Sequence, residues 1–402
     1  MDISKRANTI QASPLRKLMP FADKAKEEGK KIYHLNIGQP DIKTPDAILN
    51  EYRNFAEEVL AYGPSQGLKL YRENLVNYYK RHGIEVNPDE IVVTTAGSEA
   101  LIFAMMVTCD PGDEIIIPEP FYTNYNGFST IADVKIVPLT TYAEEGFDLP
   151  DKKTIEAKIT DKTKAILLCN PGNPTGKVYT PEEMKRVAEL ALEYDLFVIS
   201  DEVYREFVYD DLSHTSIMDM EELQERAVMV DSISKRYSAC GARIGCLISK
   251  NSDLIAATIK FAQARLCPPT IDQLAANAAI DIEQEYFVDV LQEYKNRREI
   301  VFNALQKIDD VVCIKPKGAF YVIAKLPIDN AENFVKWMLT DFDIDGETVM
   351  FAPAEGFYAT PAMGRDEVRL AYVLNTESLK KAMQIFTEGL ITYKKLKKEY
   401  ND

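Results

Sequence analysis

The sequence predicts an α/β protein with a large domain, built on an open and mostly parallel sheet flanked by helices, and a smaller α+β domain. Two observations predict this fold. Between about residues 90 and 250, apolar runs of four or five residues alternate with short loops and helical segments, as in parallel strands joined by helices. Beyond about residue 290 the pattern changes to a long helix, further strands and a C-terminal helix.

Three segments follow from this change of pattern. Residues 1–45 are expected to form an N-terminal arm and part of the small domain, residues 46–290 the large domain, and residues 291–402 the rest of the small domain. The 402 residues, 46% of them hydrophobic, are enough for two cores.

Charge and composition exclude several classes of protein. The chain has 47 basic and 63 acidic residues, so its net charge is 47 − 63 = −16. This charge argues against a nucleic-acid partner. No apolar run is long enough to span a membrane, and the first twenty residues lack the apolar core of a secretion signal. The scattered cysteines and three distant histidines predict free thiols, no metal site and a cytoplasmic protein.

The elements follow in order along the chain. A helix is predicted over Arg16–Glu28, ended by Gly29. The strands of the large sheet are predicted at Ile91–Thr95, Glu114–Ile117, Val134–Val137, Ala165–Cys169, Leu196–Ile199, Ala227–Val230 and Ile244–Ile248. Helices are predicted over Glu99–Thr108, Pro181–Tyr194 with Thr180 as N-cap, Glu285–Ile308 and Thr376–Lys395, and strands of the small domain at Lys317–Val322 and Val368–Val373.

The stretch Ser232–Gly245 holds the first candidate for chemistry. Lys235 follows a predicted buried strand, where partial desolvation lowers the pKa of a lysine and frees its amine as a nucleophile. Arg243 offers a planar fork of donors suited to phosphate, and Ser232 adds a hydroxyl. A surface lysine is the simpler interpretation of Ser-x-x-Lys alone. A penicillin-recognising enzyme is another, but the sequence lacks the Ser-Asp-Asn and Lys-Thr-Gly motifs that it needs.

Five candidate residues lie just past the carboxyl ends of predicted strands: Gly97, Tyr122, Asn173, Asp201 and Lys235. In an open parallel sheet, ligands bind in the crevice at those ends. Gly97 and Ser98 also open a helix, where free backbone N–H groups can meet an anion. The sequence therefore predicts one ligand site at this edge of the sheet.

Each of these residues also has a simpler interpretation. Tyr122 fits ordinary packing, and Asp201 fits either a structural hydrogen bond or the partner of a cation. Arg369 lies in an apolar strand, either on its solvated face or as a bidentate receptor for a carboxylate. The segments at Gly38 and Tyr62 are typical of turns.

Three motifs taken together resemble the class I aminotransferases, which are pyridoxal-phosphate enzymes of fold type I. They are Asn170-Pro-Gly-Asn-Pro-Thr-Gly176, Asp201-Glu-Val-Tyr204, and Ser232-Ile-Ser-Lys235 with Arg243. The resemblance extends from Gly38-Gln-Pro-Asp41 to Arg369. It implies an aminotransferase with pyridoxal 5′-phosphate bound in residues 46–290, and with Lys235 as the catalytic residue that carries the cofactor as a Schiff base.

The resemblance also implies a role for each remaining candidate. Asp201 would pair with the pyridine nitrogen, Tyr204 and Asn173 would hydrogen-bond the phenolate oxygen, and Tyr122 would stack on the ring. The phosphate would be held by Gly97, Ser98, Ser232, Arg243 and, from across a homodimer interface, Tyr62 of the partner subunit. Substrate would contact Gly38, Asn173 and Arg369.

The reaction expected from the resemblance is a ping-pong transfer of an amino group from an L-amino acid to a 2-oxo acid. Aspartate is expected to lead the donors, with aromatic amino acids and alanine close behind, and 2-oxoglutarate is the expected acceptor. A lyase or decarboxylase on the same scaffold is an alternative. A transcription regulator with an aminotransferase-like domain fits poorly, because the chain is acidic and no helix-turn-helix module precedes residue 30.

A second cation is needed to recognise the side chain of aspartate. Some aspartate-preferring relatives place a lysine after the strand Ile91–Thr95, where this chain has Ser98. Arg265 is the candidate in its place, with structural pairing to an acid as the alternative.

Overall fold

The computed structural model describes residues 1–12, 14 and 16–399. Its larger sheet has seven strands in the order β2-β8-β7-β6-β5-β3-β4. Their bounds are β2 Ile91–Thr95, β3 Glu114–Glu119, β4 Lys135–Thr140, β5 Thr163–Cys169, β6 Phe197–Asp201, β7 Ala227–Ser232 and β8 Ile244–Ile248. Strands β7, β6, β5, β3 and β4 pair in parallel, while β8 is antiparallel to both β2 and β7. The predicted open, mostly parallel sheet is confirmed.

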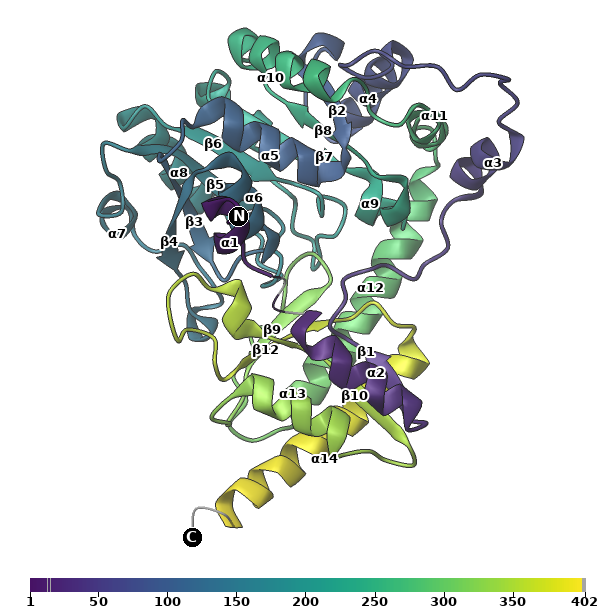
Figure 1. Cartoon of the computed structure of the whole chain (residues 1–402), viewed down its shortest axis with the longest axis vertical. Coiled ribbons are helices and arrows are strands. Elements are labelled where there is room, and N and C mark those ends of the chain that lie inside the picture. Colours follow the sequence, from purple (N-terminus) through teal and green to yellow (C-terminus); the bar gives the residue numbers. More distant parts are fainter. Residues whose placement is uncertain (13, 15, 400–402) are drawn as a thin grey trace.

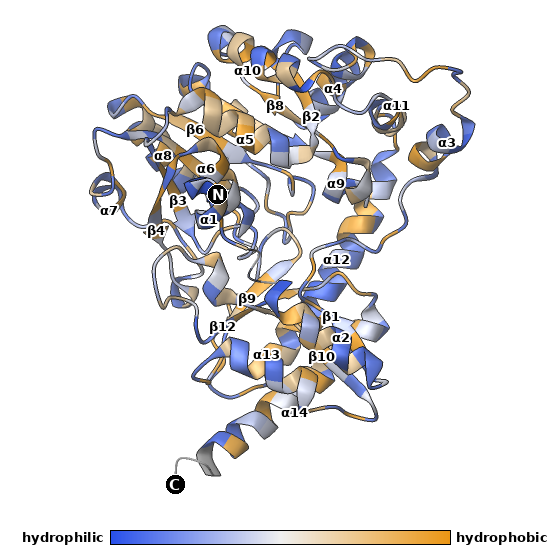
Figure 2. Ribbon diagram, viewed as in Figure 1, coloured by the Kyte–Doolittle hydropathy of each residue, from blue (hydrophilic) through white to orange (hydrophobic). Residues whose placement is uncertain are grey.

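Both faces of this sheet are buried, because its strands are apolar on each side. Ile115 and Ile117 belong to one apolar cluster and Ile116 to another, as the alternation of a strand requires. Figure 2 shows β6 and β8 mainly in orange. The helices of this part are α3 Asp46–Asn54, α4 Lys69–Arg81, α5 Ala96–Thr108, α6 Asn124–Ala132, α7 Lys152–Glu156, α8 Pro181–Glu193, α9 Ile233–Arg236, α10 Ser252–Arg265 and α11 Thr270–Ala278.

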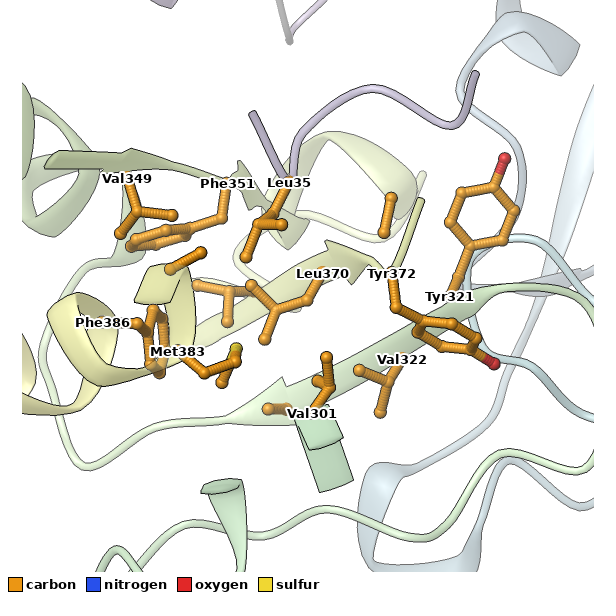
Figure 3. Packing of buried hydrophobic residues seen from close by; sticks show 14 of the residues in the cluster. Leu35, Val301, Tyr321, Val322, Val349, Phe351, Leu370, Tyr372, Met383 and Phe386 are labelled. Atoms are coloured by element: carbon orange, nitrogen blue, oxygen red, sulfur yellow. The ribbon is translucent and has the colours of Figure 1, made fainter. Parts of the chain in front are cut away.

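A smaller part combines the two ends of the chain. Strand β1 (Lys31–His34) pairs in parallel with β10 (Glu347–Met350). Strands β11 (Ala352–Pro353), β12 (Glu367–Ala371) and β9 (Tyr321–Lys325) form an antiparallel sheet. Helices α2 Met19–Glu27, α12 Gln284–Leu305, α13 Ala331–Thr340 and α14 Thr376–Glu399 cover them. Figure 3 shows Leu35, Val322, Leu370 and Phe386 in the core that results.

Two segments connect the parts. Helix α12 runs from beside the large sheet down to the small part (Figure 1). At the N-terminus, α1 (Lys5–Thr9) packs against α6, whereas α2 packs against α13 and β1. Helix α1 therefore belongs with the large part and α2 with the small part.

Lys235 lies just past the end of β7, as predicted, in the short helix α9. Two local predictions need correction. The strand predicted at Lys317–Val322 begins only at Tyr321, because the backbone N–H groups of Lys317 and Gly318 both donate to the carbonyl oxygen of Gly176 in a turn. Helix α5 begins at Ala96 and so includes Gly97 and Ser98 in its first turn.

Within the described residues, no helix is both long and apolar enough to span a membrane. The same part of the chain has no group of three His, Cys, Asp or Glu side chains placed to hold a metal ion.

Candidate active site

A cavity of ≈ 690 Å³ lies at the carboxyl edge of the large sheet, where it faces the small part. Eleven of the thirteen residues singled out from the sequence line it: Gly38, Gly97, Ser98, Tyr122, Asn173, Asp201, Tyr204, Ser232, Lys235, Arg243 and Arg369. Segments that are up to 331 residues apart in the sequence, from Gly38 to Arg369, thus meet at one place, as the strand-end argument predicts.

Lys235 enters this cavity from α9. The side-chain oxygen of Ser232 caps α9 by accepting from the backbone N–H of Ser234 at 3.2 Å, so the helix begins where β7 ends. The amine Nζ of Lys235 donates to the carbonyl oxygen of Gly38 at 3.0 Å. Gly38 has to be a glycine here, because a Cβ would lie 1.9 Å from the Tyr321 hydroxyl.

Asp201, the last residue of β6, lies at the buried end of the cavity. Its Oδ2 accepts from the Tyr125 hydroxyl at 2.8 Å, while its Oδ1 is buried without a hydrogen-bond partner. Burial raises the pKa of Asp201 to about 6, against the smaller effect of the Tyr125 hydrogen bond. An ionised carboxylate with an empty acceptor position is a receptor for a cationic N–H.

Arg369 of β12 carries a buried positive charge in the wall of the same cavity. It donates to the carbonyl oxygen of Asn36 at 2.6 Å and to Oδ1 of Asn173 at 3.3 Å. No carboxylate of the described residues pairs with Arg369, and its Nε has no hydrogen-bond partner. Burial lowers the pKa of its guanidinium group. The guanidinium stacks between the rings of Tyr321 and Phe357, at 4.8 and 4.9 Å from their centroids. Such a buried, uncompensated cation calls for an anionic ligand.

Tyr204 and Asn173 line the same cavity. The amide of Asn173 donates to the Tyr204 hydroxyl at 3.4 Å, and this hydroxyl lies 2.9 Å from that of Tyr321. Burial raises the pKa of Tyr204 well above its usual value, so the hydroxyl keeps its proton and can donate it in a hydrogen bond.

Donors for an anion gather at the start of α5. Gly97 and Ser98 occupy the first turn of this helix, where backbone N–H groups have no partner within the helix. Arg243 and Ser232 line the same region of the cavity wall. The Arg243 carbonyl oxygen accepts from the N–H of Ala96 at 2.9 Å, which holds the arginine beside the helix start.

A buried ionic network lies directly behind these residues. Arg205 follows Tyr204 and Arg236 follows Lys235, and both guanidinium groups pair with the carboxylate of Asp231. Burial alone would raise the pKa of Asp231, but the charges of Arg236 and Arg205 bring it down to about 2. Arg205 also pairs with Glu202, the neighbour of Asp201, at 3.1 Å. One network therefore fixes the segments that carry three of the cavity residues.

Tyr62 and Arg265 do not line the cavity. The Tyr62 side chain is 83% exposed on the surface of the chain. The expectation that Arg265 receives a substrate carboxylate does not fit its surroundings, because its Nε lies 3.2 Å from both oxygens of Glu99. Its other nitrogens donate to the carbonyl oxygens of Ser65 and Val93. Glu99 in turn accepts from the N–H of Thr95 at 2.8 Å, so Arg265 holds the start of α5 instead.

Comparison with known proteins decides the family. Residues 30–386 match the family model described as aminotransferase class I and II. The chain belongs to the class I and II aminotransferases. It is 32% identical to a probable aspartate aminotransferase of Methanocaldococcus jannaschii over 96% of this chain and 99% of that protein. It is also 32% identical to an aspartate aminotransferase of Pyrococcus abyssi over 98% of this chain and all of that one.

Solved structures give the same family and fold. An alanine aminotransferase from Pyrococcus furiosus superposes with a TM-score of 0.89 at 32% identity, covering 97% of this aminotransferase and 100% of that chain. The Thermotoga maritima aspartate aminotransferase superposes with a TM-score of 0.88 at 30% identity, covering 96% and 100%. The fold of this chain is therefore that of the fold type I aminotransferases.

Aminotransferases of this family depend on pyridoxal phosphate, and the cavity of this chain fits that group. The vacant Oδ1 of Asp201 suits the protonated ring nitrogen, and the Lys235 amine suits the aldehyde carbon. The N–H groups at the start of α5, with Ser232 and Arg243, suit the phosphate.

Sequence reasoning missed several residues of the cavity and its support. They are Tyr125, which donates to Asp201, Tyr321 and Asn36, which contact Tyr204 and Arg369, and Arg16, which lies at the cavity wall. Tyr321 could have been found from the sequence, because it lies within the apolar strand predicted at Lys317–Val322. Arg16 begins the helix predicted over Arg16–Glu28, but neither it nor Tyr125 and Asn36 belongs to a motif that indicates a site.

Proposed function

We propose that this aminotransferase moves the amino group of L-aspartate to 2-oxoglutarate by a ping-pong mechanism. The observation that carries the proposal is the set of groups that line one cavity: the Lys235 amine, a vacant Asp201 oxygen and the Arg369 cation, which no carboxylate of the described residues pairs with. Relatives named aspartate aminotransferases align over nearly the whole chain and support the choice of donor.

Pyridoxal phosphate, when bound, supplies an electron sink for the carbanion that forms when the substrate Cα loses its proton. The protein's task is to hold that group and to move the proton. We infer that Asp201, ionised at neutral pH because its pKa is about 6, keeps the ring nitrogen protonated. Tyr204 and Asn173 would hydrogen-bond the phenolate oxygen of the bound cofactor, and Tyr122 would pack on its ring.

Substrate binding and proton transfer fall to two further residues. Arg369 takes the α-carboxylate in a bidentate pair, which fixes the orientation of Cα. With cofactor and substrate bound, the Lys235 amine would be free to take up the proton of the substrate Cα as general base and to give it back as general acid. Gly38, whose carbonyl oxygen holds the amine in this structure, lies where substrate passes.

The oligomer and its location are part of the proposal. We infer a homodimer in which Tyr62, which is exposed and lies outside the cavity of its own chain, reaches the phosphate site of the partner subunit. All six cysteines are unpaired, which supports a reducing compartment such as the cytoplasm.

A screen of half-reactions tests the activity. The yellow holoenzyme is mixed with each amino acid, and its conversion to the pyridoxamine form is followed by absorbance. Aspartate is expected to react fastest. Alanine and aromatic amino acids are the second candidates, because an alanine aminotransferase and an aromatic-amino-acid aminotransferase of Thermococcus litoralis are also similar to this chain.

Variants of two lysines test the assignment of the amine. Lys235→Ala should lose turnover by several orders of magnitude, and borohydride should no longer fix the cofactor to the protein. Lys260→Ala, which removes an exposed lysine of α10, should change neither. A Lys235→Ala protein with normal turnover would contradict the mechanism.

A further inference from the structure

The cavity has one more cation than the α-carboxylate and the cofactor require. Its lining includes four cationic side chains, Arg16, Lys235, Arg243 and Arg369, and one carboxylate, Asp201, in a chain whose net charge is −16. Lys235, Arg243 and Arg369 already have roles in the proposed function. Arg16 has none.

Arg16 lies in a segment that is held by the residues that follow it. It begins a single 3-10 turn, Arg16–Leu18, that leads into α2. Leu18 is fully buried in the core of the small part, and the neighbouring Lys17 pairs with Glu332 of α13. Met19, the first residue of α2, lines the cavity beside Arg16.

The guanidinium of Arg16, in contrast, is exposed and uncommitted. Within residues 1–12, 14 and 16–399, no carboxylate lies within ion-pair distance of it, and it makes no side-chain hydrogen bond. Arg265, the other candidate, has its donors occupied by Glu99 and two carbonyl oxygens. Of the two arginines, only Arg16 combines an open cavity position with unused donors.

We propose that Arg16 binds the side-chain carboxylate of a dicarboxylic substrate and so sets the preference for aspartate and 2-oxoglutarate. This inference rests on the proposed function. Arg369 and Arg16 come from separate segments of the small part, β12 and the turn before α2, and both face the same cavity. A substrate with two carboxylates can engage both, whereas alanine engages Arg369 alone. The planar fork of an arginine suits a carboxylate in two-point contact.

The test compares Arg16→Met with Lys17→Met in the holoenzyme, using aspartate and alanine as donors. A charge-assisted hydrogen bond to carboxylate corresponds to roughly 10- to 100-fold in kcat/KM. The ratio of kcat/KM for aspartate to that for alanine should fall by this factor in Arg16→Met, mainly through KM. Arg16→Lys should restore part of the ratio. Lys17→Met, which changes the adjacent cation outside the cavity, should keep the wild-type ratio.

A binding measurement provides a second readout without turnover. Calorimetric titration of the holoenzyme with maleate, a dicarboxylate that cannot donate an amino group, should show a similar loss of affinity in Arg16→Met and none in Lys17→Met. Unchanged maleate affinity and an unchanged donor ratio would overturn the role of Arg16. A wild-type enzyme that converts neither aspartate nor alanine would instead overturn the proposed function, so the two failures are distinguishable.

Discussion

The buried carboxylate of Asp201 lowers the stability of the cofactor-free protein, although the proposed function requires it. The Asp201 carboxylate is buried and has one vacant oxygen, and burial raises its pKa from 3.8 to about 6. The folded protein without cofactor therefore binds a proton more tightly here than the unfolded chain does. Above pH 6 the folded state holds a charge that it solvates poorly, and below pH 6 this destabilisation is relieved.

Asp201→Asn should therefore stabilise the cofactor-free protein at high pH. A shift of about two pKa units corresponds to about 3 kcal/mol, so we expect the free energy of unfolding to rise by roughly 2–3 kcal/mol at pH 8. The gain should shrink as the pH falls through 6 and disappear near pH 4. Urea denaturation across this pH range measures it.

The same variant should bind pyridoxal phosphate more weakly and turn over more slowly, because an amide cannot keep the ring nitrogen protonated. A stability gain that stays constant between pH 8 and pH 4 would show that Asp201 does not titrate as described.

At the scale of elements, one carboxylate ties two functional segments together. Asp231 of β7 accepts from Tyr79 of α4 at 2.7 Å and pairs with Arg205 and Arg236. All of these side chains are buried, so the loss of one partner leaves charges without compensation.

Asp231→Asn should lower the free energy of unfolding by about 3–5 kcal/mol, as is typical when one partner of a buried ion pair is removed. The pKa of Asp231 is about 2 against 3.8 for the unfolded chain, so its stabilising effect is complete above pH 4 and is lost as the pH falls through 2. Chemical denaturation at pH 7 measures the difference.

Asp195→Asn is the matched control. Asp195 pairs with Arg226 but is 84% exposed, so its replacement should change stability by less than about 0.5 kcal/mol. Equal effects of the two variants would mean that the Asp231 network contributes no more than a surface pair.

The elements of the large sheet could be predicted from the sequence, because each strand is an apolar run bounded by turn residues. The same pattern located Gly97, Tyr122, Asn173, Asp201 and Lys235, since strand ends in a parallel sheet converge. Arg16 and Arg265 could not be sorted in this way. Which of the two arginines is free to bind substrate depends on the pairing of Arg265 with Glu99. These two residues are 166 positions apart in the sequence, and no local pattern reveals such a pairing.

At the scale of the whole molecule, the exposed Tyr62 has its proposed role only when a second subunit is present. If it completes the site of a partner, mixed subunits should complement each other. Tyr62→Phe and Lys235→Ala proteins, each impaired alone, should recover activity when unfolded and refolded together, because one site of each hybrid dimer carries neither change.

Tyr142→Phe, a change at another exposed tyrosine, should be as active as the wild type and serves as the control. Sedimentation should show a dimer for all these proteins. An active monomer, or hybrids without recovered activity, would contradict a shared site.

The strand pairing also determines at which point of its synthesis the protein can complete its sheets. Strand β2 is hydrogen-bonded in the large sheet to β8 alone, with Ile91 opposite Ile248, and β1 pairs with β10, with Lys31 opposite Glu347. A ribosome must therefore make more than 150 further residues before β2 has its neighbour, and more than 300 before β1 has its own. Until then the nascent chain exposes unpaired strand edges, and these are the surfaces by which incomplete chains aggregate. Chaperone demand should accordingly be highest for chains that end before residue 244, and cofactor capture should be among the last events of folding.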